Sequence, residues 1–560
     1  MTIASSRHFS KLVQDFIGNY DGSAIRQFFP YPPFPSDEEI RASIAARRAD
    51  QAAQGNEGLR TAVIERITET HRAANGLTDA VREHLRMLAD DSCFAIVTGQ
   101  QVGILAGPLY TLYKTLHTIM IAREYSKRFP EYSFVPVFWQ ETEDHDFPEV
   151  SSVGIVNSDF QLKHITYTPA EPPDRKQVGA MPFELEALNE FFAELRAALP
   201  KTEFTDEVIA LCERCYAPGV PFAEAQSAML CRLFAEDGLL ILNANTRALK
   251  SYASPIFEKE LTTTPTLSDT LNSYSESLKP QYHAQIDANG MNTFFVESGK
   301  RYKLHKEAGG FRYQDTAISD SDLLATLKNE PERFSMNVVL RPLVQDTILP
   351  TAAYIAGPGE IAYFAQLGSA YTWAGMHMPV IIPRISMTLV DDRFYKLADK
   401  FSTSLESLLE FGTDLVKELL KSEHEDTISE SFEQSVEDAE MAIERLRNLV
   451  ESTDATLGGA LTNLKGKTIT QLRDFGTKVA AAERKKQQAS RQQFEKALQV
   501  LLPENKLQER ELNLVYFLNR YGIGFWQAFK AHVMGSDRSL KEHHLIPISS
   551  ILEPKPTEAQ

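Results

Sequence analysis

The chain has 560 residues, of which 43% are hydrophobic, so it can bury a sizeable core and is expected to fold as two or more domains. Its 58 basic and 76 acidic residues leave a net charge of −18. That balance argues against a nucleic-acid partner, because phosphate neutralisation requires clustered cations. Four cysteines are too few for a disulfide framework, and no segment resembles a secretory signal or a membrane span. We therefore expect a cytoplasmic protein with no membrane partner.

Residues 1–89 are predicted to form a helical segment that packs on the core. After an irregular Pro-rich start, Ser36 and Glu39 have the spacing of a capping box, in which serine caps the helix and glutamate reaches back to it. We expect this segment to support the fold rather than to carry chemistry.

Residues 90–387 are predicted to form an α/β core that begins with a βαβ unit. An apolar run at residues 93–97 ends in a glycine-containing segment, which leads into a helix carrying Lys114. A second apolar run, residues 134–139, ends in an acidic cluster at residues 143–146. Ligands bind beyond the carboxyl ends of strands in open parallel sheets. Both polar segments are therefore expected at a ligand site.

The remainder of the core shows shorter patterns of the same kind. They predict strands or a hairpin at residues 153–168, a helix at 184–199, a strand at 238–243, paired strands at 294–297 and 302–305, a strand and helix at 349–367, and a strand at 379–383. The turn at residues 298–301 is interpreted as solvated, although its basic tip could reach an anion. Cys212 and Cys215 form a Cys-x-x-Cys pair without the second pair or histidines of a structural zinc site, so we predict buried cysteines and no zinc.

Residues 388–502 are predicted to form a helical coiled coil. Glycine and proline nearly vanish here, and apolar residues recur at three- and four-residue spacing. Gly458 and Gly459 are a candidate break at which one long helix reverses onto another. Coiled coils of this type commonly mediate dimerisation or carry a domain, and we expect a homodimer. Residues 503–560 regain aromatic residues and are predicted to return to the core.

The glycine segment after the first strand is a candidate ligand site. Gly99 and Gly103 match neither a dinucleotide fingerprint nor a phosphate loop ending in Gly-Lys-Ser/Thr. Glycines do let a ligand approach the backbone, and the following helix offers free amide hydrogens. A tight turn without a ligand explains the segment equally well.

The acidic cluster and two arginines are further candidates. Glu143, Asp144 and Asp146 offer oxygen ligands for Mg²⁺, or a carboxylate–imidazole pair with His145. The alternative is a solvated loop, but the position directly after Phe138–Trp139 favours a functional site, because burial perturbs protonation. Arg341 and Arg384 each follow an apolar run and are predicted to end strands, where they either bind an anion or form a structural salt bridge.

Together these motifs resemble the bacillithiol biosynthesis cysteine-adding enzyme family. The resemblance extends over most of the chain and rests on the following residues: Gly99, Gln100, Gln101, Gly107, Tyr110 and Lys114; Trp139 with Glu143, Asp144, His145 and Asp146; Arg341 with Gln345; Gly357, Gly359 and Glu360 with Tyr363 and Gln366; Arg384 with Ser386; and Gln508 with Arg510.

The resemblance implies a Rossmann-like core with inserted connecting segments and a coiled coil that supports a homodimer. It also implies the last step of bacillithiol synthesis, in which L-cysteine is joined through an amide to the amine of glucosaminyl malate. ATP or ADP is an implied cofactor, and Mg²⁺ would be compatible with it. The sequence has no His-x-Gly-His signature and no Lys-Met-Ser-Lys-Ser loop, so adenylation and phosphorylation of the cysteine carboxylate both stay open.

The residues suggest a mechanism as a hypothesis. His145, oriented by Asp144 or Asp146, would deprotonate the glucosamine ammonium, and Arg341 would pair with the malate carboxylates. The glycine segment, the helix carrying Lys114, and Arg384 would hold phosphate or carboxylate charge.

Two other functions are considered. One is a sugar-nucleotide-dependent glycosyltransferase, in which the acidic cluster holds magnesium and a diphosphate. The other is a non-catalytic dimer that senses a metabolite. A sensor needs binding but no acid–base group, so polar residues at several predicted strand ends fit it poorly.

Overall fold

The computed structural model describes residues 1–420 and 423–553, and it divides into two compact units. The first unit joins Met1–Val390 to Lys506–Gln560, and the second is Asp391–Asn505. Within the described residues, no helix is long and apolar enough to cross a membrane.

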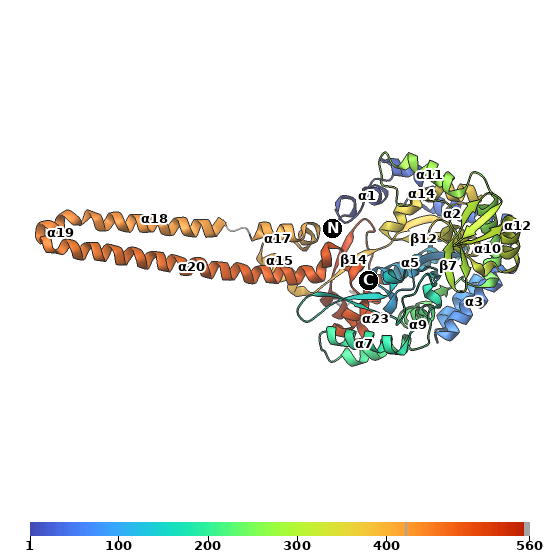
Figure 1. The fold of residues 1–560 in the computed structure, drawn as a ribbon, viewed down its shortest axis with the longest axis horizontal. Helices are drawn as coiled ribbons and strands as arrows, with labels where there is room; N and C mark the ends of the chain where they lie inside the picture. Colours follow the sequence, from blue (N-terminus) through green and yellow to red (C-terminus); the bar gives the residue numbers. More distant parts are fainter. Residues whose placement is uncertain (421–422, 554–560) are drawn as a thin grey trace. The chain divides into compact units, whose positions relative to one another are not determined.

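A five-stranded parallel sheet forms the centre of the first unit (Figure 1). The strand order is β13-β12-β1-β2-β5, and each adjacent pair is parallel. The bounds are β1 (Cys93–Gln101), β2 (Ser133–Glu141), β5 (Leu240–Leu242), β12 (Thr351–Ala356) and β13 (Val380–Pro383). The chain begins with the central strand β1 and adds β2 and β5 on one side. It then adds β12 and β13 on the other side of β1. This is the predicted Rossmann-like arrangement, and its topological switch point lies between β1 and β12.

The predicted βαβ unit is confirmed, with one change in its first turn. β1 and β2 are buried on both faces, as expected for apolar strands covered by helices. Helix α5 (Leu109–Arg128) connects them, and Tyr125 packs with Phe94 and Phe134 in one buried cluster. β1 continues to Gln101, so the first glycine of the predicted turn lies inside the strand.

Four helices precede the sheet, as predicted. They are α1 (Lys11–Gly18), α2 (Asp37–Gln54), α3 (Leu59–Ala73) and α4 (Asp79–Leu88). The capping box at the start of α2 is confirmed, because Ser36 Oγ accepts from the Glu39 amide and the Glu39 carboxylate accepts from the Ser36 amide. Arg47 of α2 donates to the Thr351 carbonyl at 3.1 Å, which ties this segment to β12.

Helices and small sheets are inserted between the central strands. Between β2 and β5 lie α6 (Phe147–Val150), the hairpin β3 (Ser152–Val156) and β4 (Leu162–Thr166), α7 (Leu185–Ala198), α8 (Thr205–Cys215) and α9 (Phe222–Phe234). Between β5 and β12 lie α10 (Arg247–Thr262), α11 (Leu267–Leu278), β6 (Thr293–Glu297), β7 (Lys300–Lys303), β8 (His305–Glu307), β9 (Gly310–Tyr313), β10 (Thr316–Ser319), α12 (Asp320–Asn329), β11 (Phe334–Met336) and α13 (Leu340–Ile348).

The remaining elements of the first unit follow β12. They are α14 (Pro358–Ala374), β14 (Ser386–Val390), α21 (Gln508–Glu511), α22 (Leu514–Tyr521), α23 (Gly524–Met534), β15 (His543–Pro547) and α24 (Ile548–Leu552). β14 and β15 pair in parallel. The tail over residues 506–553 thus belongs to the first unit. All four cysteines are buried and free.

Two predictions about arginines are wrong. Arg341 does not end a strand, because it lies in the first turn of α13. The run before it completes β11 at Met336 and then leads into α13 at Leu340, and a run this short has no period that separates strand from helix. Arg301, predicted to lie in a solvated turn, is on β7 and only 5% exposed, whereas Ser298 and Gly299 at the tip of the turn are exposed as predicted.

The second unit is helical. Its helices are α15 (Asp392–Lys400), α16 (Leu405–Phe411), α17 (Thr413–Leu419), α18 (Glu423–Arg445), α19 (Arg447–Thr453) and α20 (Gly458–Leu501). α18 and α20 lie side by side (Figure 1). Gly476 is buried in α20, and a Cβ atom there would lie 2.9 Å from the Phe432 ring, so the two helices approach closely at this level. The reversal takes place through α19, and α20 begins at Gly458.

Candidate active site

A cavity of about 660 Å³ opens where the central strands end. Gly99 and Gln100 come from the end of β1, Trp139 from β2, and Gly357 and Gly359 from the start of α14. These elements flank the switch point between β1 and β12, where ligands bind in doubly wound sheets.

Most of the predicted site residues line this cavity. They are Gly99, Gln100, Gln101, Tyr110, Lys114, Trp139, Asp144, His145, Arg341, Gly357, Gly359, Glu360, Tyr363, Arg384 and Arg510. These residues therefore line one cavity, although they are spread along the chain from Gly99 to Arg510.

The other predicted residues lie outside its lining. Gly103 and Gly107 line a second cavity, and Asp146 is exposed at the start of α6. The rest are buried and hold neighbouring backbone or side chains in place: Glu143, Gln345, Gln366, Ser386 and Gln508. Gln366, for example, bonds both backbone groups of Ile286, which adjoins the cavity residue Gln285.

Lys114 is held inside the protein by three oxygen atoms. Its ammonium lies 2.6 Å from the Glu360 carboxylate, 2.6 Å from the Gly99 carbonyl and 3.5 Å from Gln100 Oε1. Burial lowers the pKa of Lys114, and the Glu360 charge opposes that shift. Glu360 also accepts from the Gly357 amide at 2.6 Å, so its carboxylate caps the start of α14. Lys114 therefore joins the ends of β1 and α14.

Arg341 is 8% exposed and has neutral hydrogen-bond partners. Its Nη1 donates to Gln345 Oε1 and its Nη2 donates to the Tyr363 hydroxyl, both at 2.9 Å. Within residues 1–420 and 423–553, it makes no ion pair with a carboxylate. Burial would lower the pKa of Arg341, but nearby groups, among them the Glu360 and Glu141 carboxylates, raise it without direct contact. A guanidinium with no carboxylate in contact suits an anionic ligand.

The Arg384 guanidinium is held by Glu509 of the C-terminal segment and by the carbonyl of the next residue, Ile385. Nη2 lies 2.6 Å from Glu509 Oε1, and Nη1 donates to the Ile385 carbonyl at 2.9 Å. The same Glu509 carboxylate accepts from the Ser386 hydroxyl at 2.8 Å. Arg384 lowers the pKa of Glu509 against the opposing effect of burial. This contact ties α21 to the residue that follows β13.

Two carboxylates at the end of β2 have different environments. Glu141 lines the cavity, and burial together with the nearby Glu143 charge raises its pKa to about 7. Its Oε1 accepts from the Glu143 amide at 3.3 Å. The Glu143 side chain points away, because it pairs with Lys250 at 2.7 Å. Glu143 therefore anchors the loop, and Glu141, which the sequence interpretation missed, faces the cavity.

Asp144, His145 and Arg301 form a contact group on the cavity wall. Arg301 Nη1 lies 3.0 Å from Asp144 Oδ1 and 3.3 Å from His145 Nδ1. Burial would raise the pKa of Asp144, but its hydrogen bonds with His145 and the Arg301 charge lower the pKa to about 2. The sequence separation of 157 residues between Asp144 and Arg301 gave no signal for this contact.

Several buried donors of the wall are unsatisfied. Within the described part of the chain, Trp139 Nε1, Arg301 Nε and Arg384 Nε have no hydrogen-bond partner. Arg384 Nε lies 3.6 Å from the position that a Cβ of Gly357 would occupy, so it borders the start of α14. Such groups in native proteins call for a ligand or solvent partner. Their donor character fits phosphate or carboxylate oxygen atoms.

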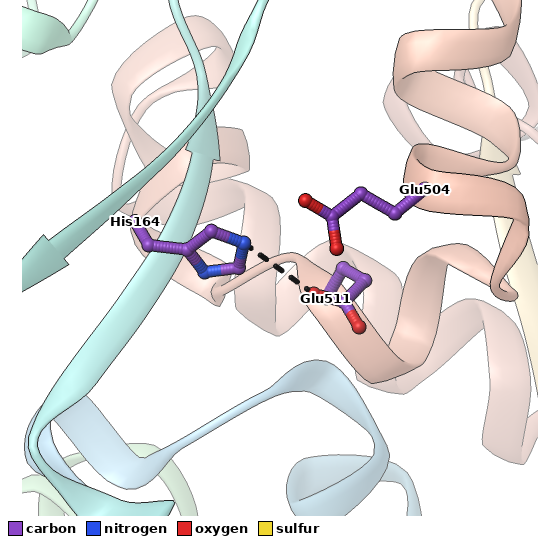
Figure 2. Close-up of side chains that lie close together, drawn as sticks. All are labelled: His164, Glu504 and Glu511. Atoms are coloured by element: carbon purple, nitrogen blue, oxygen red, sulfur yellow. Dashed lines mark ion pairs between the residues drawn. The ribbon is translucent and has the colours of Figure 1, made fainter. Parts of the chain in front are cut away.

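A second cavity of about 390 Å³ adjoins the first. The two share Gln100, Gln101, Tyr110, Glu149 and Arg510 as lining residues. His164 and Glu511 line the second cavity and form an ion pair at 3.7 Å (Figure 2). Two reactants could therefore be held on either side of one shared wall.

Comparisons with known proteins identify the family. Residues 1–385 match the model "Bacillithiol biosynthesis BshC, N-terminal Rossmann-like domain", and residues 387–546 match "Bacillithiol biosynthesis BshC, C-terminal coiled-coil domain".

Curated relatives agree over most of their length. The chain is 32% identical to a protein of Salinibacter ruber, with 95% of both chains covered. It is 35% identical to one of Chlorobaculum tepidum, with 83% of this chain and 84% of the relative covered. Each relative is named "Putative cysteine ligase BshC". The resemblance drawn from the sequence is confirmed: the chain belongs to the bacillithiol biosynthesis BshC family.

Proposed function

We propose that this protein joins the carboxylate of L-cysteine to the amine of glucosaminyl malate, in the last step of bacillithiol biosynthesis. A nucleotide, ATP or ADP, would activate the carboxylate, because an amine does not displace oxide from a free carboxylate. The amine nitrogen then forms the C–N bond and loses a proton, while the activated oxygen leaves with the phosphate or with AMP. Family membership and the names of the relatives support this proposal.

The observation that carries the proposal is the buried Arg341 without a carboxylate partner among the described residues. The malate part of the substrate would supply that counter-charge through its carboxylates. Guanidinium and carboxylate groups pair through parallel hydrogen bonds, which gives directional recognition as well as charge.

A second anion subsite would lie at the start of α14. The Arg384 Nε donor is unpaired there within the described residues, and Gly359 has open space where a side chain would stand. A helix start with a nearby guanidinium suits a phosphate group or a carboxylate. When bound, the nucleotide would supply a leaving group for the cysteine carboxylate. Asp144 would be a poorer Mg²⁺ ligand than a free carboxylate, because both of its oxygen atoms already accept hydrogen bonds.

One experiment separates this proposal from the two alternatives. Purified protein is incubated with cysteine, glucosaminyl malate and ATP or ADP, and the products are examined for bacillithiol and for AMP, ADP or phosphate. A glycosyltransferase would instead consume a nucleotide sugar, and a sensor would bind without turnover. His145→Ala is expected to remove ligation without loss of the fold. Absence of bacillithiol under every nucleotide condition would count against the proposal.

We also propose a homodimer formed through the second unit. Large apolar side chains are exposed along α18, α19 and α20: Met441, Leu449, Leu464 and Phe475. Exposed apolar surface of this kind marks interaction sites. Leu449→Asp with Phe475→Asp should yield monomers in light scattering after size-exclusion chromatography. The matched control, Lys478→Asp on α20, should stay dimeric, and a wild-type monomer would overturn the proposal.

A further inference from the structure

The contact between Arg301 and His145 restricts the protonation of the imidazole. Arg301 Nη1 lies 3.3 Å from His145 Nδ1. A guanidinium group has N–H donors and no acceptor, so the imidazole nitrogen that faces it must accept. Neutral His145 then has its lone pair on Nδ1 and its proton on Nε2.

Arg301 is held firmly in this position. Its Nη2 donates to the Met336 carbonyl, its guanidinium lies 4.0 Å from the centre of the Phe294 ring, and its backbone amide donates to the Arg175 carbonyl. The side chain is almost fully buried. Rotation of the side chain away from His145 would break the contacts with Met336 and Phe294 and leave a buried charge unpaired.

Asp144 cannot impose the opposite tautomer in this arrangement. Its Oδ1 lies 3.5 Å from His145 Nδ1, which is long for a hydrogen bond. The same oxygen already accepts from Arg301 at 3.0 Å and from the His145 backbone amide at 2.7 Å. Its Oδ2 accepts from Gln101 at 2.9 Å. The carboxylate thus makes shorter bonds to Arg301 and to the loop than its 3.5 Å contact with the imidazole, so it competes for Nδ1 less strongly than Arg301 does.

We infer that Arg301 is a positioning residue that fixes His145 as the Nε2–H tautomer, so that His145 donates a hydrogen bond to a reacting oxygen instead of removing a proton. This inference rests on the proposed function, and it replaces the predicted role of His145 as the base. As the amine attacks the activated cysteine, the carbonyl oxygen becomes negative and the Nε2–H group stabilises it. The C–O bond to the leaving group then breaks, and its electron pair leaves with phosphate or AMP. The proton on the attacking nitrogen passes to a carboxylate. Glu141 is the candidate acceptor, because its Oε2 has no hydrogen-bond partner among the described residues.

A substitution series tests the donor role. Glutamine at position 145 can place an amide N–H near the position of Nε2, but it cannot accept a proton at neutral pH. We expect His145→Gln to keep kcat within about tenfold of wild type, while His145→Ala loses a hundredfold or more, about the cost of removing one oxyanion donor. If His145→Gln is as inactive as His145→Ala although both variants melt like wild type, the donor role is wrong.

A spectroscopic test does not depend on turnover. Protein with ¹⁵N-labelled histidine is measured without ligand at about pH 8.5, where an ordinary imidazole is neutral, and His145→Gln identifies the His145 signals. We expect an unprotonated Nδ1 and a protonated Nε2 in the wild type. A protonated Nδ1 would overturn the inference even if the protein ligates cysteine.

The matched variants are Arg301→Leu and Arg333→Leu. Removal of Arg301 should move the proton to Nδ1, toward the freed Asp144 carboxylate. Arg333 also stacks on a phenylalanine, Phe295, at 4.4 Å, but it does not contact His145, so its loss should leave the His145 signals unchanged. If Arg301→Leu fails to fold, the wild-type spectrum alone decides. If no ligation is found but the tautomer is as expected, the proposed function fails and the positioning role of Arg301 stands.

Discussion

The ammonium of Lys250 lies 2.7 Å from the Glu143 carboxylate, and both side chains are withdrawn from solvent. Lys250 also donates to the Phe334 carbonyl at 2.7 Å. One buried ion pair therefore connects the loop after β2 to α10 and to β11. Removing one partner of such a pair leaves a buried charge that nothing compensates.

Lys250→Met is accordingly expected to destabilise the first unit. The free energy of unfolding, measured by urea denaturation, should fall by about 3–5 kcal/mol. The double variant Lys250→Met with Glu143→Leu should recover much of that loss, because neither charge stays buried alone. A single variant as stable as wild type would show that Glu143 finds another partner.

Arg341→Gln should weaken binding of the anionic substrate. A hydrogen bond to a charged group contributes about 1.5–3 kcal/mol, so the KM for glucosaminyl malate should rise by about 10- to 100-fold, with a smaller change for cysteine. The control is Arg312→Gln, since Arg312 is exposed and pairs with Glu307. Equal effects on both substrates would contradict a role in recognising the malate group.

Glu141 should make both activity and stability depend on pH. Its pKa is raised to about 7 in the folded protein. If Glu141 accepts the proton, kcat/KM should fall as pH drops below about 7, and Glu141→Gln should lose that acid limb. Persistence of the limb in Glu141→Gln would assign it to another group.

Glu141 should affect stability in the opposite direction: kcat/KM rises with pH, whereas the free energy of unfolding falls. The folded state binds this proton more tightly than the unfolded state, so stability falls as pH rises from the ordinary range of a glutamate through about 7. Glu141→Gln should therefore gain stability relative to wild type between pH 5 and 8. Thermal melting across that range measures the difference, and a constant difference would contradict the raised pKa.

Lys114→Met should impair the site and the fold together. The ammonium joins the Gly99 carbonyl to the Glu360 carboxylate at 2.6 Å each, and methionine would leave both oxygen atoms unsatisfied. We expect a lower melting temperature and a loss of kcat. A variant with wild-type stability and reduced kcat would instead assign Lys114 to direct contact with the reactants.

The sequence predicted the position of a site residue where an apolar strand pattern and the topology of a parallel sheet together determine it. The apolar runs ending in Gly99 and Trp139 could be predicted to place polar groups on one sheet edge, because parallel strands share that edge. The wrong strand at Arg341 arose because a short apolar run lacks a period. Arg301 was missed because its burial depends on Asp144 and Met336, which only tertiary packing brings to it.

The bond between Glu360 and the start of α14 fixes one side of the site before any ligand binds. Glu360 holds the Gly357 amide, the Tyr354 hydroxyl and the Lys114 ammonium at once. The cavity floor is therefore assembled before any ligand arrives, and little ordering entropy is lost there on binding. The wall that carries Arg301 and Phe294, on the small sheet of β6 and β7, is likewise fixed without a ligand, because Arg301 contacts the Phe294 ring and donates to the Met336 carbonyl. Exchange measurements should therefore find both walls protected with or without substrate.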